Sequence, residues 1–93
     1  MGSRPLSSLE QAFGETVRNL RTERGVSQEE LADASGIHRT FLSQVERGLK
    51  SPSLRTMSGL AEALEIPLHQ LVRRVCQQRD RRVRKRRKNA GAR

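Results

Sequence analysis

The sequence predicts an all-α fold, a compact domain of five helices followed by a basic C-terminal tail. Apolar residues recur along the chain at the three- and four-residue spacing of amphipathic helices, and no segment alternates in the manner of a strand. The 93 residues include no Trp, no Tyr and only two Phe. The core must therefore consist of Leu, Val, Ile and Ala, which suits packed helices better than a β-sandwich. The length is that of one small domain.

The first helix is predicted over about 8–24, where apolar residues fall on one stripe and Gly25 provides the C-terminal stop. The stripe consists of Leu9, Phe13, Val17 and Leu20. Residues 1–7 before it are predicted to be a flexible N-terminus, and the folded domain is predicted to span residues 8–76.

Two short helices are predicted next, at about 28–34 and 38–47, joined by a tight turn. Ser27 and Glu30 have the spacing of a capping box at the start of the first, an arrangement that contributes about 1 kcal/mol. Gly36 lies where the chain must reverse with a positive φ, which only glycine adopts without strain.

The fourth helix is predicted to begin near Pro52–Ser53, because proline is favoured at the first position of a helix. The fifth is predicted to begin near Pro67. The residues expected to face inward are Leu54, Met57, Leu60, Ala61 and Leu64 in the fourth helix, and Leu68, Leu71, Val72 and Val75 in the fifth.

The positive charge of the chain is confined to its C-terminal end. Residues 1–72 hold 8 Lys and Arg against 9 Asp and Glu, whereas residues 73–93 hold 11 Lys and Arg against Asp80 alone. Residues 77–93 are low in complexity and without an apolar stripe, so they are predicted to be a basic tail that is disordered when free. The alternative is an extension of the fifth helix. Such a tail is attracted to any phosphate backbone and adds affinity without sequence information.

The sequence offers no catalytic or metal-binding constellation. His38, His69 and Cys76 lie on separate elements without metal-ligand spacing, so we expect no enzyme activity, no metal and no cofactor. A lone cysteine forms no internal disulfide, and the chain has neither an apolar signal region nor a membrane-length apolar run. The expected location is the cytoplasm.

Two short helices at a sharp angle, the second with an exposed polar face, are typical of the helix-turn-helix that reads the DNA major groove. The planar fork of Arg39 suits guanine, the amide of Gln44 suits adenine, and Thr40 suits a thymine methyl or a phosphate. His38 is expected either to read a base or to cap the helix, and the general alternative is a solvated polar helix face. The predicted base-contacting residues are His38, Arg39, Thr40, Ser43 and Gln44.

Phosphate contacts are predicted on both sides of this helix. The N-terminus of the preceding helix presents free backbone N–H groups with Gln28, and the loop after the second helix brings a cation and hydroxyls to the same side. For Ser51 and Ser53 the alternatives are loop chemistry and helix capping. The predicted phosphate-contacting residues are Gln28, Arg47, Lys50, Ser51 and Ser53.

The same segment resembles the lambdoid repressor and Cro family, also called the xenobiotic-response-element type. The matching residues are small Ala32, turn Gly36 and apolar Leu31, Ile37, Leu42 and Val45, and the likeness extends from about Phe13 to Val72. The stretch GIHRTFLSQVERG is most similar to the controller proteins of restriction–modification systems. Ser35 departs from the family, which usually places an apolar residue before the turn glycine.

The resemblance implies a compact five-helix, lambda-repressor-like DNA-binding domain. It also implies that Arg21 and Glu46 form a largely buried ion pair, and it supports the phosphate role of Gln28. Such proteins usually bind double-stranded DNA as homodimers, which read two half-sites of a (pseudo)palindromic operator. The predicted dimer interface consists of Leu64, Ile66, Leu68, Leu71, Val72 and Val75. Phe41 is expected to be partly buried, and the alternative is that it lies against the DNA backbone and bases where two subunits meet.

The sequence thus predicts a sequence-specific, homodimeric transcriptional regulator of bacterial or phage origin, without a membrane partner. Three alternatives remain open at this stage. One is an antitoxin-type autorepressor with a toxin partner, and another is a prophage-type repressor. The third is a broad nucleic-acid-binding factor that relies on the basic tail. The sequence does not determine whether a protein partner such as a toxin or RNA polymerase exists.

Overall fold

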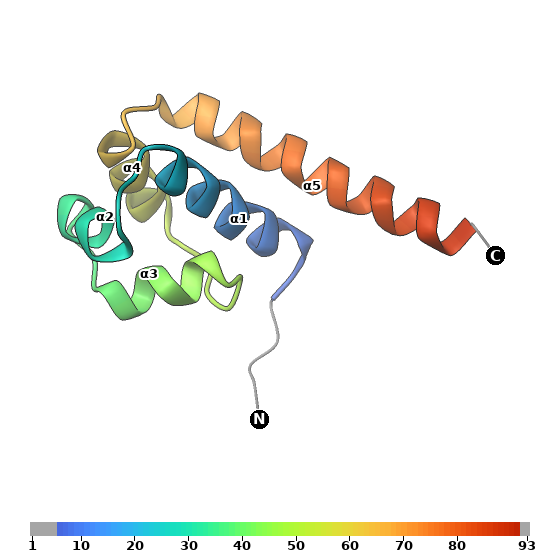
Figure 1. The fold of residues 1–93 in the computed structure, drawn as a ribbon, viewed down its shortest axis with the longest axis horizontal. Helices are drawn as coiled ribbons and strands as arrows, with labels where there is room; N and C mark the ends of the chain where they lie inside the picture. The colour runs from blue at the N-terminus through green and yellow to red at the C-terminus, as the bar shows by residue number, and fades with distance from the viewer. Residues whose placement is uncertain (1–5, 92–93) are drawn as a thin grey trace.

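The computed structural model describes the backbone of residues 6–91 and the side chains of residues 6–85. This part of the chain contains five α-helices and no strand, which confirms the predicted fold class (Figure 1). The helices are α1 (Ser8–Glu23), α2 (Gln28–Ser35), α3 (Arg39–Glu46), α4 (Leu54–Ala63) and α5 (Leu68–Gly91). The first five residues of the predicted flexible N-terminus, and the last two of the predicted tail, lie outside the described residues.

Helix α1 is the centre of the packing. It contacts α3 on one side and α5 on another, while α2 packs against α3 and α4, and α4 also touches α5. The core contains aliphatic side chains and one aromatic ring, as the composition predicts. Its buried residues are Ala12, Phe13, Val17, Leu20, Leu31, Ala32, Leu42, Val45, Leu60, Ala61, Leu64, Leu71 and Val75.

Each of the first four helices begins with a side chain that accepts a hydrogen bond from a backbone N–H of the first turn. The predicted capping box of α2 is confirmed, because Ser27 Oγ accepts from the Glu30 N–H at 3.0 Å. In return the Ser27 N–H donates to Glu30 Oε1 at 2.9 Å. This bond, together with that to the Ser27 side chain, lowers the pKa of the Glu30 carboxyl. The stabilisation by Glu30 is therefore present above the ordinary carboxyl pKa and is lost as the pH falls through the lowered one.

The same four helices also end alike. A residue with positive φ donates its N–H to the carbonyl three residues back, and the apolar residue after it donates five residues back. Gly36, the predicted turn glycine, is one of these residues, with a φ of 72°. The positive-φ residues are Gly25, Gly36, Gly48 and Glu65, and they are followed by Val26, Ile37, Leu49 and Ile66. Glu65, with a φ of 56°, holds a side chain where the other three ends have none.

The predicted disorder of the basic tail is wrong for residues 77–91, which continue α5 without interruption. Two side chains tie this part of the helix to α1. Gln78 donates to Glu15 Oε1 at 2.8 Å, and the Arg82 guanidinium binds both Glu15 and Gln11. Arg, Lys and Gln are also strong helix formers, so the absence of an apolar stripe does not end the helix.

The start of α4 differs from its prediction. Pro52 is not at the first helical position, because Ser53 is the N-cap, as the alternative for that residue expected, and its hydroxyl accepts from the Thr56 N–H at 3.0 Å. The helix therefore begins at Leu54, which was expected to face inward and is instead exposed. Leu54 precedes the turn that packs on the core, where Met57 is the first residue of α4 in contact with it.

We predict that Glu65→Gly stabilises the protein. An L side chain in the left-handed conformation costs about 1–2 kcal/mol, and the greater freedom of glycine in the unfolded chain offsets part of the gain. We expect the free energy of unfolding in urea to rise by about 0.5–1 kcal/mol. Glu65→Ala is the control, because it retains the strain and removes the same exposed ion pair with Arg24. Equal stability of the glycine and alanine variants would show that the left-handed backbone at position 65 is not strained.

Candidate nucleic-acid interface

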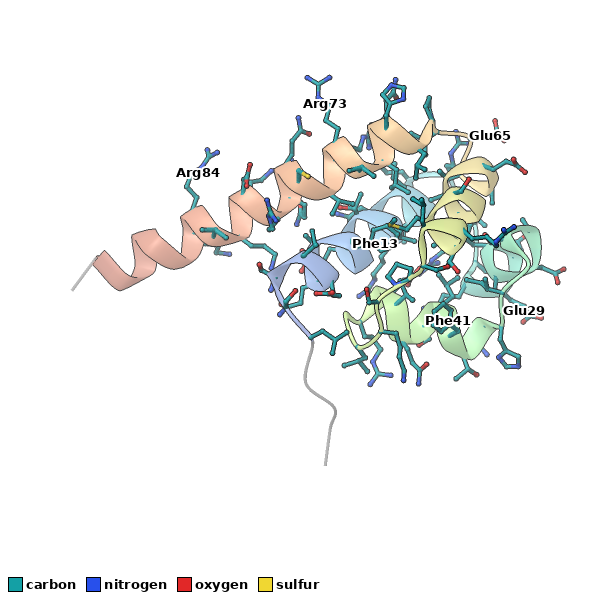
Figure 2. All side chains as sticks on the ribbon, turned by 180° about the vertical axis from the view of Figure 1, so that it is seen from behind. Phe13, Glu29, Phe41, Glu65, Arg73 and Arg84 are labelled. Atoms are coloured by element: carbon teal, nitrogen blue, oxygen red, sulfur yellow. The ribbon has the colours of Figure 1, made fainter. Side chains whose placement is uncertain are left out.

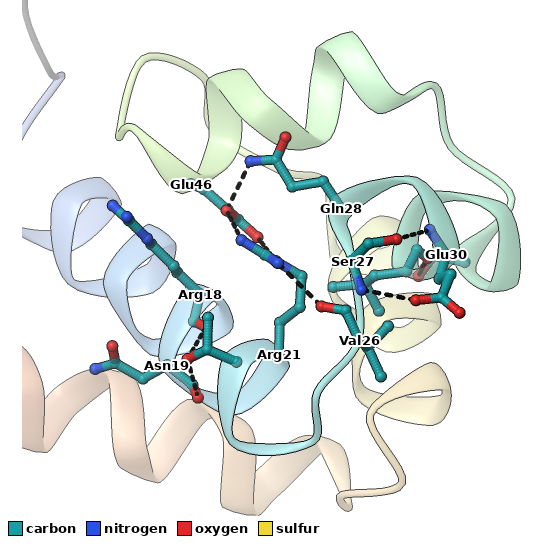
Figure 3. A network of polar contacts seen from close by, with 11 residues as sticks. Arg18, Asn19, Arg21, Val26, Ser27, Gln28, Glu30 and Glu46 are labelled. Carbon is teal, nitrogen blue, oxygen red and sulfur yellow. Dashed lines mark hydrogen bonds and ion pairs between the residues drawn. The ribbon is translucent and has the colours of Figure 1, made fainter.

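The end of α3 is joined to α1 and α2 by a polar network (Figure 3). Arg21 Nε of α1 donates to Glu46 Oε2 at 2.7 Å, and Arg21 Nη2 donates to Glu46 Oε1 at 3.1 Å. Gln28 Nε2 donates to the same Glu46 Oε1 at 2.9 Å, and the remaining Arg21 Nη1 donates to the Val26 carbonyl at 3.0 Å. Three helices and the loop between α1 and α2 are therefore fixed together at one carboxylate.

This network lies largely away from water. The side chains of Arg21 and Glu46 are 13% and 3% exposed, so the predicted buried ion pair is confirmed. A fork-to-fork pair of this geometry satisfies both charges, and no buried side-chain nitrogen or oxygen among the described residues lacks a partner. Glu46 also lies at the C-terminal end of α3, where the helix dipole disfavours an acid, so its burial depends on Arg21.

Gly14 is a positional requirement that the sequence analysis missed. It is buried where α1 crosses α3, and a Cβ at this position would lie 2.3 Å from the Val45 carbonyl oxygen and 2.5 Å from that of Glu46. Those atoms are backbone, so they do not move aside for a methyl group. An isolated glycine inside a helical apolar pattern is the signal of such a close approach.

The turn between α2 and α3 has the geometry of the predicted motif. Leu31 and Ala32 are buried, while Ile37 and Phe41 are partly buried against the core, as predicted for Phe41. Ser35, which departs from the family pattern, donates its hydroxyl to the Leu31 carbonyl at 2.7 Å. The polar side chain is thus accommodated by its own helix.

The exposed side of α3 faces a shallow groove of about 270 Å³. This groove collects most of the residues predicted to contact bases, together with two predicted to contact phosphate. It is lined by Gln28, Arg39, Thr40, Ser43, Gln44 and Arg47. Residue His38 is not part of the lining; its Nδ1 accepts from the Thr40 N–H at 3.1 Å, so it caps α3 as the alternative expected. The structure thus brings donors and acceptors from two helices to one surface.

The residues predicted to contact phosphate differ in how free they are. Lys50 and Ser51 are exposed in the loop between α3 and α4. The Gln28 amide donates to Glu46. The groups at the start of α2 that remain free to bind a phosphate are the backbone N–H groups of its first turn. The Ser53 hydroxyl caps α4 and bonds to Thr56 Oγ1 at 3.0 Å.

The predicted dimer interface is partly wrong. Leu64, Leu71 and Val75 are buried within the single chain, where they complete its core. Of the other three, Ile66 and Leu68 are partly buried, and only Val72 is exposed. An apolar groove of about 270 Å³ lies beside Val72 instead, between α1, α5 and the start of α4. Its lining is Leu9, Glu10, Phe13, Ser51, Pro52, Met57, Val72, Val75 and Cys76.

No group of three or more His, Cys, Asp or Glu side chains in the described part of the chain is placed to hold a metal ion. None of the helices within residues 6–91 combines the length and apolarity that a membrane span requires.

Comparisons with known proteins agree with this geometry. A sequence model of the helix-turn-helix family matches residues 17–71. The control protein C.SmaI of Serratia marcescens is 38% identical over 66 residues, which are 71% of this chain and 79% of that protein. The chain spans less than half of several longer regulators that it also matches.

Solved structures give the same result. The restriction-modification controller protein C.AhdI from Aeromonas hydrophila is 44% identical, with a TM-score of 0.65 over 67% of this chain and 94% of that one. The biofilm regulator SinR, a protein known from Bacillus subtilis, was solved in complex with DNA. That structure is 31% identical, with a TM-score of 0.61 over 64% of this chain and 97% of the other. The resemblance stated from the sequence is confirmed.

We predict that Arg21→Ala and Glu46→Ala each lower the free energy of unfolding by about 3–5 kcal/mol, because each leaves a buried charge without its partner. The control is Arg82→Ala, which breaks an ion pair whose side chains are 31% and 39% exposed. That variant should cost at most about 1 kcal/mol. Urea unfolding measures all three. A Glu46→Ala variant as stable as Arg82→Ala would show that the network does not hold the fold.

Proposed function

Since the chain belongs to the helix-turn-helix family of DNA-binding transcriptional regulators, of the lambdoid repressor and Cro type, we propose that it acts as a homodimer on a (pseudo)palindromic operator. The observation that carries the proposal is the groove beside α3. There four predicted base-contacting side chains lie with Gln28 and Arg47 on one exposed surface. The buried ion pair of Glu46 fixes that surface on the domain.

In this proposal α3 is the recognition helix. Arg39 and Thr40 lie in its first turn and Ser43 and Gln44 one turn later, so all four project from the same side. Arg39 is exposed and its fork is free to pair with guanine O6 and N7, while Gln44 pairs with an adenine edge. His38 contributes by capping α3, and its Nε2 remains available to a base or phosphate.

Phosphate contacts would orient this helix in the groove. The free N–H groups at the start of α2 and the exposed Lys50 and Ser51 flank α3 on either side, and Arg47 follows its last turn. Contacts of this kind fix the register on the duplex and carry no sequence information. Ser53 is assigned here to phosphate through the α4 N-terminus, with its hydroxyl retained as the cap.

The homodimer contact is proposed at the apolar groove beside Val72. Val72, Leu9 and Leu54 are exposed large apolar side chains, and the first two line the groove itself. A second copy related by a two-fold axis would cover the same surface on both subunits. The partly buried Ile66 and Leu68, from the original prediction, remain candidates for its edge.

The controller proteins of restriction–modification systems are the subclass that we favour, because C.SmaI and C.AhdI match most of their own length. A regulator of transcription acts where the chromosome is, so the proposed location is the bacterial cytoplasm. No catalytic step is part of this function.

We predict that Arg39→Ala weakens binding to the preferred operator by about 1–3 kcal/mol and relaxes selectivity at one base pair per half-site. The preferred sequence is obtained by selection from a random pool, and gel shifts on operator and scrambled DNA measure the loss. Lys50→Ala is the contrasting variant. It should weaken binding similarly on both DNAs and reduce the salt slope by about one unit. An equal loss on both DNAs for Arg39→Ala would make it a phosphate contact.

We predict that Val72→Glu dissociates the homodimer. Burying a valine side chain contributes about 1.5–3 kcal/mol, so self-association should weaken by about tenfold or more. Analytical ultracentrifugation measures the oligomeric state, and circular dichroism checks the fold. The control is Leu6→Glu, an apolar and more exposed position outside the groove. Retention of the dimer by Val72→Glu would place the interface elsewhere.

A further inference from the structure

The C-terminal part of α5 is an addition to the family domain. The family match ends at Leu71, whereas the helix continues to Gly91, and we call residues 72–91 the α5 extension. In Figure 1 it projects past the end of α1 and away from the other helices. Val75 is in the core, and Gln78 and Arg82 bond to α1, so the extension leaves the domain in a fixed direction.

The face of the extension that is turned away from α1 is basic. Arg73 and Arg84 lie roughly 120–180° around the helix from Val75, Gln78 and Arg82, the residues that touch α1, at 3.6 residues per turn. Of the exposed cations with described side chains, Arg73 and Arg84 lie on this face, whereas Arg74, Arg81 and Lys85 line the grooves between α5 and α1. Asp80, the one acidic residue from position 73 to the end of the sequence, lies on the same face, roughly 20–40° from the two arginines at 3.6 residues per turn. Among the described ion pairs, Arg82 is the one cation of the extension that takes part.

This basic face and the recognition helix lie on opposite sides of the molecule. Helix α1 packs against both α3 and α5 and separates them. In Figure 2, Arg73 and Arg84 point away from the body, and Phe41 of α3 is on its far side. A duplex held by α3 is therefore out of reach of these two arginines. The expectation that the basic tail strengthens binding to the same duplex does not apply to them.

We propose that the basic face of the α5 extension binds the phosphate backbone of a second nucleic-acid duplex while α3 holds the operator. The inference rests on the proposed function in one respect, that α3 holds an operator duplex. Arginine forks suit phosphate oxygens, and the 20 residues of the extension are about 30 Å long at 1.5 Å per residue. That length is close to one turn of a duplex, about 34 Å.

The composition of the face favours a duplex over other polyanions. A protein interface takes its energy from buried aromatic or aliphatic side chains, and the outward cluster has none. Its members are Arg73, Gln77, Asp80 and Arg84. Single strands bind by stacking bases on aromatic rings. The two Phe of the chain are in the body, and there is no Trp or Tyr. A charged face without rings contacts backbone phosphates and is indifferent to sequence.

The test is a bridging assay with the full chain. An operator duplex is immobilised, saturated with protein and then offered a short labelled duplex of unrelated sequence, either DNA or RNA. The variant is Arg73→Gln/Arg84→Gln, and the matched control is Arg73→Lys/Arg84→Lys, which keeps the charge. We expect the Gln variant to bind the operator within about twofold of wild type but to capture the second duplex severalfold less. Its salt slope for capture should fall by about two units, since each lost phosphate contact removes about 0.9.

The two labelled duplexes show whether DNA or RNA is the source of the phosphates. Capture that is the same for the Gln variant and wild type would assign bridging to the recognition helix of another subunit and overturn the proposal. Competition by poly-glutamate as strong as that by duplex would point to an acidic protein and overturn it too. If selection from a random pool yields no preferred operator, the proposed function is wrong, but the role of α5 can still be tested. The protein is then immobilised through its N-terminus, and capture of the labelled duplex is compared between wild type and the same variants.

Discussion

The position of the recognition helix depends on the ion pair between Arg21 and Glu46. Glu46 ends α3, where the helix dipole is unfavourable to a carboxylate, and it is nearly inaccessible to water. It is tolerated there because Arg21 of α1 and Gln28 of α2 both donate to it. The same contacts hold the last turn of α3 and the first turn of α2 at a fixed separation. The buried Glu46 carboxylate requires both donors, and by binding them it fixes the place of the groove that Arg39 and Gln44 line.

A second constraint acts two turns earlier on α1. Gly14 and Arg21 are seven residues apart, so they lie on the same face of the helix. Gly14 brings the α1 backbone against the carbonyls of Val45 and Glu46, and Arg21 reaches back to the Glu46 side chain. Both contacts join α1 to the last turn of α3. A side chain at position 14 would separate the helices and would also pull the ion pair apart.

Local chemistry accounts for most of what the sequence predicted correctly. Capping at Ser27 and chain reversal at Gly36 depend on neighbouring residues, so both are visible in a short window. The partner of Glu46 is 25 residues away, and only the family resemblance supplied it. Periodicity shows which residues of a helix face inward, but it does not show how completely each one is buried. Leu64, Leu71 and Val75 were therefore assigned to a dimer interface, although they are buried in the core of the single chain. The continuation of α5 is supported by helix-forming residues and by the contact of Arg82 with Gln11, 71 residues earlier, and no local pattern reveals that contact.

The distribution of charge separates two kinds of binding. The body of the chain is nearly neutral, and the surface around α3 contributes few cations, chiefly Arg39, Arg47 and Lys50. Long-range attraction to a phosphate backbone is therefore weak on that side, and in the complex that we propose, affinity depends on how well the side chains of α3 fit the base edges. The α5 extension is the reverse, rich in charge and without an element placed to read bases. Since α1 lies between the two, the charge of α5 and the polar side chains of α3 are presented on different surfaces of the domain.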